Sequence, residues 1–276
     1  MSSSQRPRVF AHRGSSGAYA EHTRAAYLHA LEEGSDGVET DVHLTADGHV
    51  ICCHDFTVDA TSDGAGKIAE MTLAELRGLD FHSWKGVDIP AAYGAPAEQF
   101  VTLDELLTLL RGAGRSVALV LELKHPGSPQ EHRQDLDDAS VEVLRAHGWD
   151  PATSQIPGDA VGTTVEVSFM SFSAESLRHL LRDHPEIPRA LVCAVFDQRE
   201  RTVPLIEEGL VGLAGPGVPW AQKHPERLKE WAHRGIPSRV WTVDDPEDAR
   251  FLIGLGAVEG LTTNHPDRIL AVRDQS

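Results

Sequence analysis

The chain has 276 residues, of which 41% are hydrophobic and 24% are charged, the usual composition of a soluble globular protein. Its formal net charge of -17 argues against nucleic acid or an anionic membrane as a partner of the overall surface. The three cysteines, Cys52, Cys53 and Cys193, follow neither a disulfide framework nor a zinc-binding spacing.

The amino-terminal residues are polar and contain no apolar segment of the kind that secretory signals have. No stretch of roughly 18 apolar residues predicts a membrane span. We therefore expect a cytoplasmic protein without integral membrane association.

Short apolar runs of the β type alternate with helical patterns along the whole chain. The predicted strands are Arg8–Arg13, Gly37–Leu44, Val117–Lys124, Val165–Met170, Ala190–Val195, Leu210–Ala214, Ser238–Val243 and Glu259–Thr263. The predicted helices are Thr23–Glu33, Leu103–Arg111, Gln130–His147, Ala174–His184, Arg199–Glu208, Pro225–Arg234, Pro246–Gly254 and a last one from Pro266.

Eight strand-then-helix units predict an α/β fold, a closed (β/α)8 TIM barrel that forms a single domain over residues 1–276. A doubly wound open sheet is the second possibility. Residues 56–101 interrupt the alternation and are rich in Gly, Thr, Asp and Pro. A segment of that length is usually functional, so we expect a small insertion after the second strand that lies over the barrel mouth.

Charged side chains stand two residues apart inside two apolar runs, as Glu39 and Asp41 in one and Glu122 and Lys124 in the other. Residues i and i+2 of a strand point to the same face, where buried charges are costly unless they serve each other, a metal or a substrate. The three carboxylates suit Mg²⁺ or Ca²⁺, which prefer oxygen ligands. Lys124 would contact a phosphate oxygen or oppose a carboxylate. His43 continues the face of Glu39 and Asp41, as a substrate contact or a supporting group.

Two histidines fall at the ends of strand-like segments. His12 and Arg13 precede a glycine turn, where arginine can hold phosphate oxygens bidentately and histidine can move a proton near neutral pH. His54 ends a short apolar run after a hairpin-turn dipeptide. A pair of histidines suits phosphodiester cleavage, with one base for the nucleophile and one acid for the leaving alkoxide.

Six segments, in order and over nearly the whole chain, resemble the glycerophosphodiester phosphodiesterase (GDPD) family. They are His12-Arg-Gly14, Gly37-Val-Glu-Thr-Asp41, His54-Asp55, Leu121-Glu-Leu-Lys124, Val240-Trp-Thr-Val243 and Gly260-Leu-Thr-Thr-Asn264. The resemblance implies a TIM-barrel hydrolase that depends on a divalent cation, Ca²⁺ or Mg²⁺. It implies small-molecule phosphodiester substrates such as glycerophosphocholine or glycerophosphoethanolamine.

The resemblance also implies roles for single residues. Metal ligation falls to three carboxylates and acid–base catalysis to two histidines. Arg13 and Lys124 match positions associated with the phosphate and the active-site charge, and Trp241 matches a tryptophan that can pack on the alcohol portion. The metal ligands would be Glu39, Asp41 and Glu122, and the acid–base pair His12 and His54.

One motif departs from the family pattern. The Pro-Glu-Asn-Thr stretch of the family reads Ala20-Glu-His-Thr23 here. Because the asparagine lies near the catalytic centre in the family, we expect His22 among the substrate- or phosphate-binding residues, where it replaces the amide as a donor or indicates a different substrate.

The resulting hypothesis is metal-dependent hydrolysis of glycerophosphodiesters to an alcohol and glycerol 3-phosphate. His12 is favoured as the base and His54 as the acid, although the reverse assignment stays open. The alternatives are a lysophospholipase D-like or phospholipase C-like enzyme of the same barrel group, and a non-catalytic binding barrel suggested by His22.

Two further expectations concern residues outside this set. Asn264 is expected to cap the helix that begins at Pro266. The histidines within helical patterns are expected to be solvated; they are His29, His132, His147, His179, His184 and His233.

Overall fold

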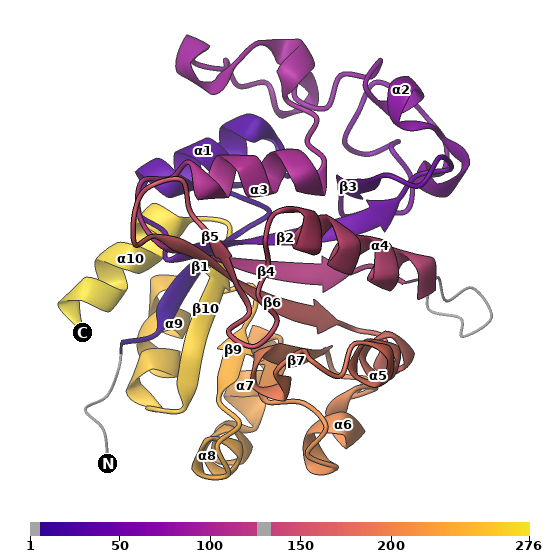
Figure 1. Ribbon diagram of the computed structural model, residues 1–276. Helices are drawn as coiled ribbons and strands as arrows, with labels where there is room; N and C mark the ends of the chain where they lie inside the picture. The colour runs from indigo at the N-terminus through magenta and orange to yellow at the C-terminus, as the bar shows by residue number, and fades with distance from the viewer. Residues whose placement is uncertain (1–5, 126–133) are drawn as a thin grey trace.

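Eight parallel strands form the centre of the fold in the computed structural model, which describes residues 6–125 and 134–276 (Figure 1). They are β1 (Arg8–His12), β2 (Gly37–Leu44), β4 (Val117–Leu123), β6 (Thr164–Ser171), β7 (Val192–Phe196), β8 (Leu213–Pro216), β9 (Ser238–Val240) and β10 (Val258–Thr263). Strand β1 pairs in parallel with both β2 and β10, so the sheet closes. The predicted (β/α)8 barrel is confirmed, and closure excludes the open sheet.

Helices surround the barrel, and two short strands pair antiparallel with it. The helices are α1 (Arg24–Glu32), α2 (Leu73–Leu76), α3 (Leu103–Arg111), α4 (Gln134–Ala146), α5 (Ala174–Asp183), α6 (Val203–Glu207), α7 (Val218–Lys223), α8 (Pro225–His233), α9 (Pro246–Gly254) and α10 (Pro266–Gln275). The short strands are β3 (Val50–Cys52), beside β2, and β5 (Gln155–Pro157), beside β6. The start of the predicted helix Gln130–His147 lies outside the described residues.

Some predicted bounds are wrong. The strand predicted at Leu210–Ala214 is β8, Leu213–Pro216, and the helix predicted at Arg199–Glu208 is the shorter α6. Glu200 has a φ of 53°, which a right-handed helix cannot contain. Sequence patterns also missed α7 and β5, because both are too short to show a period.

Helix α3 illustrates how the outer layer is held. Thr102 and Glu105 exchange hydrogen bonds between side chain and backbone at its first turn, a capping box that satisfies two otherwise free N–H groups. One face then points at the strands and is buried, and each buried leucine contributes roughly 1.5–3 kcal/mol. These leucines are Leu103, Leu106, Leu107 and Leu110.

The interior of the barrel is closed at the amino ends of the strands by an ion network. Arg8 donates to Glu259 and, at 2.6 Å, to Glu166, and Arg239 on β9 lies 3.3 Å from the other oxygen of Glu259. Above this network a small apolar cluster partly fills the barrel: Phe10, Ala118, Val120, Met170, Cys193, Val195 and Leu213.

The segment between β3 and α3, residues 53–102, has an apolar cluster that includes Val58, Ile68 and Phe81. Short 3-10 helices punctuate this segment: η1 (Ile68–Glu70), η2 (Ser83–Lys85), η3 (Ala91–Tyr93) and η4 (Pro96–Glu98). Lys85 donates a 2.7 Å hydrogen bond to the carbonyl of Ser16, which ties the segment to the loop after β1. In Figure 1 it runs from purple to magenta above α1 and α3.

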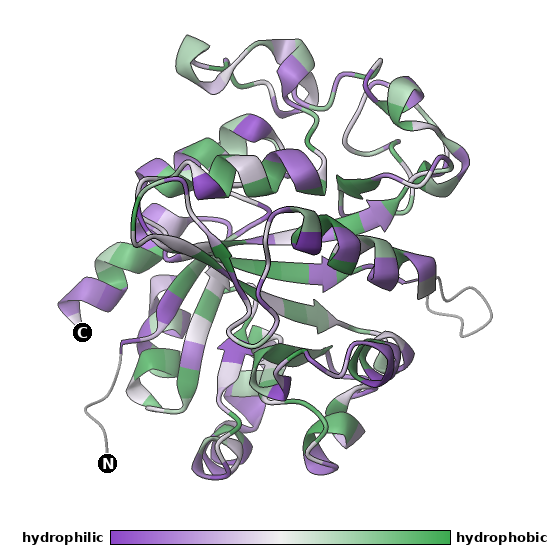
Figure 2. Cartoon of the chain, in the orientation of Figure 1, coloured by the Kyte–Doolittle hydropathy of each residue, from purple (hydrophilic) through white to green (hydrophobic). Residues whose placement is uncertain are grey.

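Hydropathy follows this layering (Figure 2). The barrel strands are mostly apolar, whereas the carboxyl ends of β2 and β4 turn hydrophilic. Among the residues that the structure describes, no helix combines the length and the apolar character that crossing a membrane requires.

Candidate active site

Three buried carboxylates meet at the carboxyl ends of β2 and β4. Glu39 and Asp41 are each 1% exposed and Glu122 is 6% exposed. Asp41 and Glu122 are direct neighbours in the parallel register, and one oxygen from each of the three carboxylates lies within 4.8 Å of the other two. The alternation of side chains along both strands produces this arrangement, as the sequence predicted.

Two cations flank the carboxylates. Lys124 Nζ lies 2.9 Å from Glu122 Oε1 and 3.4 Å from Asp41 Oδ1. Arg13 Nε lies 3.4 Å from Asp41 Oδ2, and its Nη1 donates to Glu21 at 2.9 Å. With three acidic and two basic side chains in contact, the centre retains an excess of negative charge when all are ionised.

Burial and mutual repulsion set the protonation of the acids. Burial, followed by the charges of Asp41 and Glu122, raises the pKa of Glu39 well above its usual value. Burial also raises the pKa of Glu122 to about 7, although Lys124 opposes the shift. For Asp41 burial acts in the same direction, but its neighbours, Lys124 first, hold its pKa well below the usual value. The centre therefore favours a further positive charge.

The donor set fits a hard divalent cation. Carboxylate oxygens are the ligands that Mg²⁺ and Ca²⁺ prefer. Glu39 Oε2 accepts from the backbone N–H of Arg13 at 3.1 Å, whereas its Oε1 is buried and has no hydrogen-bond partner among the described residues. A buried carboxylate oxygen without a donor is costly, and a cation would relieve that cost.

His12, at the end of β1, is held in one tautomer. Its Nδ1 lies 2.8 Å from Asn264 Oδ1, while Asn264 Nδ2 donates to Asp244 at 2.7 Å. Because Asp244 can only accept, the amide nitrogen must face it and Oδ1 must accept from His12. The proton of His12 is therefore on Nδ1, and Nε2, 4.0 Å from Glu39 Oε2, carries a free lone pair.

Burial, and then the charge of Arg13, lowers the pKa of His12 to about 4, so its imidazole is neutral near pH 7.

Asn264 was expected to cap helix α10, and that prediction is wrong. The residue at the N-cap of α10 is His265, without a side-chain cap, because the Asn264 side chain is engaged by Asp244 and His12, and by Ser16, which donates to it at 2.7 Å.

His54 follows β3 and is about one-third exposed, with Nδ1 2.8 Å from Asp55 Oδ1. Burial lowers its pKa, partly against the charge of Asp41. The backbone carbonyl of His54 lies 3.1 Å from His43 Nε2. His43 is itself 6% exposed, and its ring meets Phe56 edge-on at 5.0 Å between centroids. His43 thus supports the loop that carries His54.

A cavity of about 460 Å³ opens beside these groups. On one side His12, Arg13, His54 and Glu122 line it. The opposite wall, from β6 to β9, is largely apolar and includes Met170, Phe172, Val195 and Trp241. The Trp241 indole donates to the Gly215 carbonyl at 2.9 Å and meets Phe172 edge-on at 5.2 Å, so this wall is fixed.

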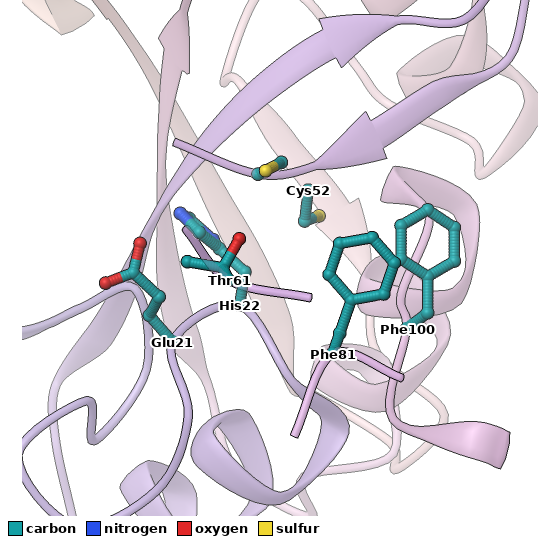
Figure 3. A pocket seen from close by; sticks show the side chains of 7 residues that line it. Glu21, His22, Cys52, Thr61, Phe81 and Phe100 are labelled. Carbon is teal, nitrogen blue, oxygen red and sulfur yellow. The ribbon is translucent and has the colours of Figure 1, made fainter. Parts of the chain in front are cut away.

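His22 occupies a different position from the other predicted residues. Its Nε2 lies 3.0 Å from Asp41 Oδ2 and its Nδ1 2.8 Å from the Tyr27 hydroxyl. It lines a separate cavity of about 10 Å³, room for about one water. Figure 3 shows His22 there beside Glu21 and Thr61, with Phe81 and Phe100 close by.

Both ring nitrogens of His22 already have hydrogen-bond partners, Tyr27 and Asp41. The phosphate contact expected of His22 is not tested by these bonds and stays a prediction. Its φ of 58° is a left-handed conformation that asparagine and histidine adopt more readily than most residues, which explains why either can stand at this position.

The structure thus gathers the predicted residues around one centre, except that His22 lines the separate small cavity. The sequence patterns did not predict Asp244 and Arg239 as residues of the site, and they assigned Asn264 to a helix cap. Arg239 could have been found, because it precedes Trp241 by two residues and must share its face. A closed barrel with clustered carboxylates, cations and imidazoles at the carboxyl ends of its strands is the architecture of a barrel enzyme.

Comparison with known proteins identifies the class. Residues 12–268 match the glycerophosphoryl diester phosphodiesterase family. A probable glycerophosphodiester phosphodiesterase 1 of Mycobacterium tuberculosis is 35% identical over 268 residues, which cover 96% of this chain and 92% of that protein. The glycerophosphodiester phosphodiesterase of Bacillus subtilis is 29% identical over 93% of this chain and 83% of its own.

Among solved structures, a phosphodiesterase of Oleispira antarctica in complex with the product sn-glycerol-3-phosphate superposes with a TM-score of 0.79. It is 28% identical, and the match covers 97% of both chains. This chain belongs to the glycerophosphoryl diester phosphodiesterase family and is a phosphodiesterase.

Proposed function

We propose that the protein hydrolyses glycerophosphodiesters, such as glycerophosphocholine and glycerophosphoethanolamine, to an alcohol and sn-glycerol 3-phosphate with the help of a divalent cation. The observation that carries the proposal is the meeting of three buried carboxylates with the lone pair of His12 beside one cavity. The product in the Oleispira structure and the names of the relatives support the substrate class.

Glu39, Asp41 and Glu122 would hold the cation, Ca²⁺ or Mg²⁺. When bound, it supplies Lewis-acid stabilisation of charge on the phosphoryl oxygens. Arg13 and Lys124 add positive charge for the phosphate, and Arg13 is among the residues that line the cavity. Trp241 forms a flat apolar wall against which the alcohol portion packs.

His12 and His54 divide the proton transfers. Nε2 of His12 takes the proton of the attacking hydroxyl group, because the bond from Nδ1 to Asn264 leaves that lone pair free. His54 gives a proton to the leaving alkoxide, and the hydrogen bond to Asp55 stabilises its protonated form. A bound phosphodiester adds a negative charge nearby, which also favours that form.

We propose further that the 56–101 insertion shapes one side of the substrate entrance. Phe56 packs on His43, and Lys85 reaches the loop after β1, so the insertion is anchored to segments that carry active-site residues. His22 contacts Asp41 and lines the separate small cavity, so it influences the carboxylate cluster through Asp41.

A second candidate, a lysophospholipase D-like activity, is favoured by exposed apolar side chains. Phe56, Trp84 and Val87 on the insertion and Phe172 at the cavity are 43%, 43%, 40% and 37% exposed, and an acyl chain could cover them. Turnover of lysophosphatidylcholine at a rate matching glycerophosphocholine, together with vesicle binding, would favour this candidate.

The decisive experiment is turnover of glycerophosphocholine by the metal-stripped protein, with Ca²⁺, Mg²⁺ or Mn²⁺ added back. Metal-restored release of choline and glycerol 3-phosphate supports the proposal and excludes a non-catalytic binding barrel. Activity confined to an aryl phosphodiester would keep the chemistry and reject the substrate. Silence with every metal and substrate would reject the proposed function.

A further inference from the structure

Arg239 lies at the inner end of the active-site cavity. It precedes Trp241, the residue that follows β9, by two residues, and both side chains line the cavity inside the barrel. The cavity that His12 and Glu122 line is also lined by Arg239, although this residue is only 3% exposed. A guanidinium therefore stands one layer below the catalytic groups.

The contacts of Arg239 leave part of its guanidinium unused. Nη1 donates to Ser168 Oγ at 2.8 Å, and Nε lies 3.3 Å from Glu259 Oε2. The guanidinium carbon is 4.2 Å from the centroid of the Phe10 ring, which fixes its plane. Nη2 is buried and has no hydrogen-bond partner among the described residues. A buried charged donor left in this way is costly, so an acceptor is expected opposite it.

No described residue of the lining is hydrogen-bonded to Nη2. Met170, Cys193 and Val195, which line the cavity together with Arg239, have apolar or weakly polar side chains. A ligand that reaches Arg239 thus packs on these side chains and meets a hydrogen-bond donor that no described residue uses.

We propose that Nη2 of Arg239 binds an oxygen on the alcohol portion of the substrate. The enzyme then prefers glycerophosphodiesters whose second alcohol carries a hydroxyl or carboxylate oxygen over those whose alcohol carries a quaternary ammonium group. A guanidinium group has only hydrogen-bond donors and carries a positive charge. It therefore binds a ligand oxygen that has a lone pair and repels a ligand group that is a cation. The inference rests on the proposed function and specifies which substrates of that class are best.

The test compares glycerophosphoglycerol with glycerophosphocholine, because both release sn-glycerol 3-phosphate and one assay measures both. We expect the wild-type kcat/KM to be roughly tenfold higher for glycerophosphoglycerol, the contribution typical of a charged hydrogen bond. Arg239→Met and Arg239→Gln abolish that preference. Arg8→Met is the matched control, because Arg8 pairs with the same Glu259 and is not among the residues that line the cavity; it keeps the preference.

Each outcome decides between the two proposals. If the wild-type kcat/KM is the same for the two substrates, the proposed role of Arg239 is overturned while the hydrolysis stands. The same holds if Arg8→Met loses the preference as completely as the Arg239 variants do. If neither Arg239 variant folds by circular dichroism, the wild-type preference alone decides. If the wild type hydrolyses neither substrate with any metal, the proposed function fails. Calorimetric binding of glycerophosphoglycerol to the metal-stripped protein then decides the subsite: roughly tenfold weaker binding by Arg239→Met supports it, and equal binding overturns it.

Discussion

His12 Nδ1 and Asn264 Oδ1, which are separated by 252 residues in sequence, lie 2.8 Å apart across the closing seam of the barrel. Strands β1 and β10 pair in parallel there, so their carboxyl-terminal loops are neighbours. Asp244 orients the Asn264 amide through two hydrogen bonds, to the backbone N–H at 2.8 Å and to Nδ2 at 2.7 Å. The chain thereby fixes which nitrogen of the His12 imidazole carries the proton and which has the free lone pair.

The first prediction concerns this orientation. In Asp244→Asn the residue can donate as well as accept, so the Asn264 amide can turn and present its nitrogen to His12. The imidazole would then carry its proton on Nε2 and fail as a base. We expect kcat to fall by roughly 10²-fold or more with little change in KM, since general base catalysis contributes roughly 10²–10⁴-fold. Steady-state kinetics checks this.

The control for this variant is spectroscopic. Asn264 is the only asparagine in the wild-type chain, so labelling with ¹⁵N-asparagine gives one side-chain amide nitrogen signal there. The Asp244→Asn variant adds a second such signal from position 244, which is recognised by its absence from the wild-type spectrum. The Asn264 signal should shift in the variant if its amide turns, and the ¹⁵N spectrum of His12 should report the other tautomer. An unchanged tautomer with reduced kcat would contradict the orientation argument and leave only a loss of packing.

The second prediction separates the two histidines by substrate. An aryl phosphodiester has a good leaving group and needs no acid. His54→Ala should therefore lose roughly 10²–10⁴-fold on glycerophosphocholine but much less on bis(p-nitrophenyl) phosphate. His12→Ala should lose activity on both. His233→Ala, an exposed histidine on α8, is the control, and the opposite pattern would reverse the assignment of base and acid.

The third prediction concerns the cation, and its readout is stability. If Glu39, Asp41 and Glu122 bind a cation that the unfolded chain does not, the ion stabilises the folded state by mass action, by about 2.7 kcal/mol at one hundred times its Kd. For a chain of this size that raises Tm by roughly 5–10 °C. Glu39→Gln should remove most of the increase, whereas Glu230→Gln on α8 should keep it. A wild-type Tm that no divalent cation changes would refute the site.

The closed barrel and the carboxylate cluster could be predicted because both follow from local patterns. Alternating strand and helix periods specify the barrel, and the spacing of Glu39 and Asp41 on one strand specifies a common face. The neighbouring position of Glu122 then follows from the order of strands. Thus a two-residue period, together with the order of the strands, was sufficient to assemble the candidate metal ligands.

Contacts between distant loops could not be predicted in this way. Asn264 looked like a helix cap because it precedes His265-Pro266. No local pattern reveals that its side-chain amide donates to Asp244, twenty residues earlier.

The histidines of α5 and its carboxyl-terminal end give a second case. His179 and His184 were expected to be solvated and are 3% and 7% exposed, because Asp138 on α4 lies 2.9 Å from His184 and 3.4 Å from His179. His132 lies outside the described residues.

The last prediction uses a carboxylate far from the active site. Glu207, at the end of α6, accepts hydrogen bonds from Arg234, Arg227 and the Trp231 indole. These bonds, that of Arg234 first, lower the pKa of Glu207 to about 2 from a usual value of 4.5. Because the folded state holds the ionised form more tightly than the unfolded chain does, this carboxylate contributes stability fully above pH 4.5 and loses it as the pH falls toward 2.

Glu207→Gln should therefore lower Tm at pH 7, and the difference from the wild type should shrink progressively between pH 4.5 and pH 2. Thermal melts followed by circular dichroism across that range give the comparison. Glu226→Gln, an exposed carboxylate at the start of α8 that pairs only with Lys229 among its described neighbours, is the matched control and should change Tm little at any pH. A Glu207→Gln deficit that stays constant down to pH 2 would mean that the side chain acts through packing and not through its charge.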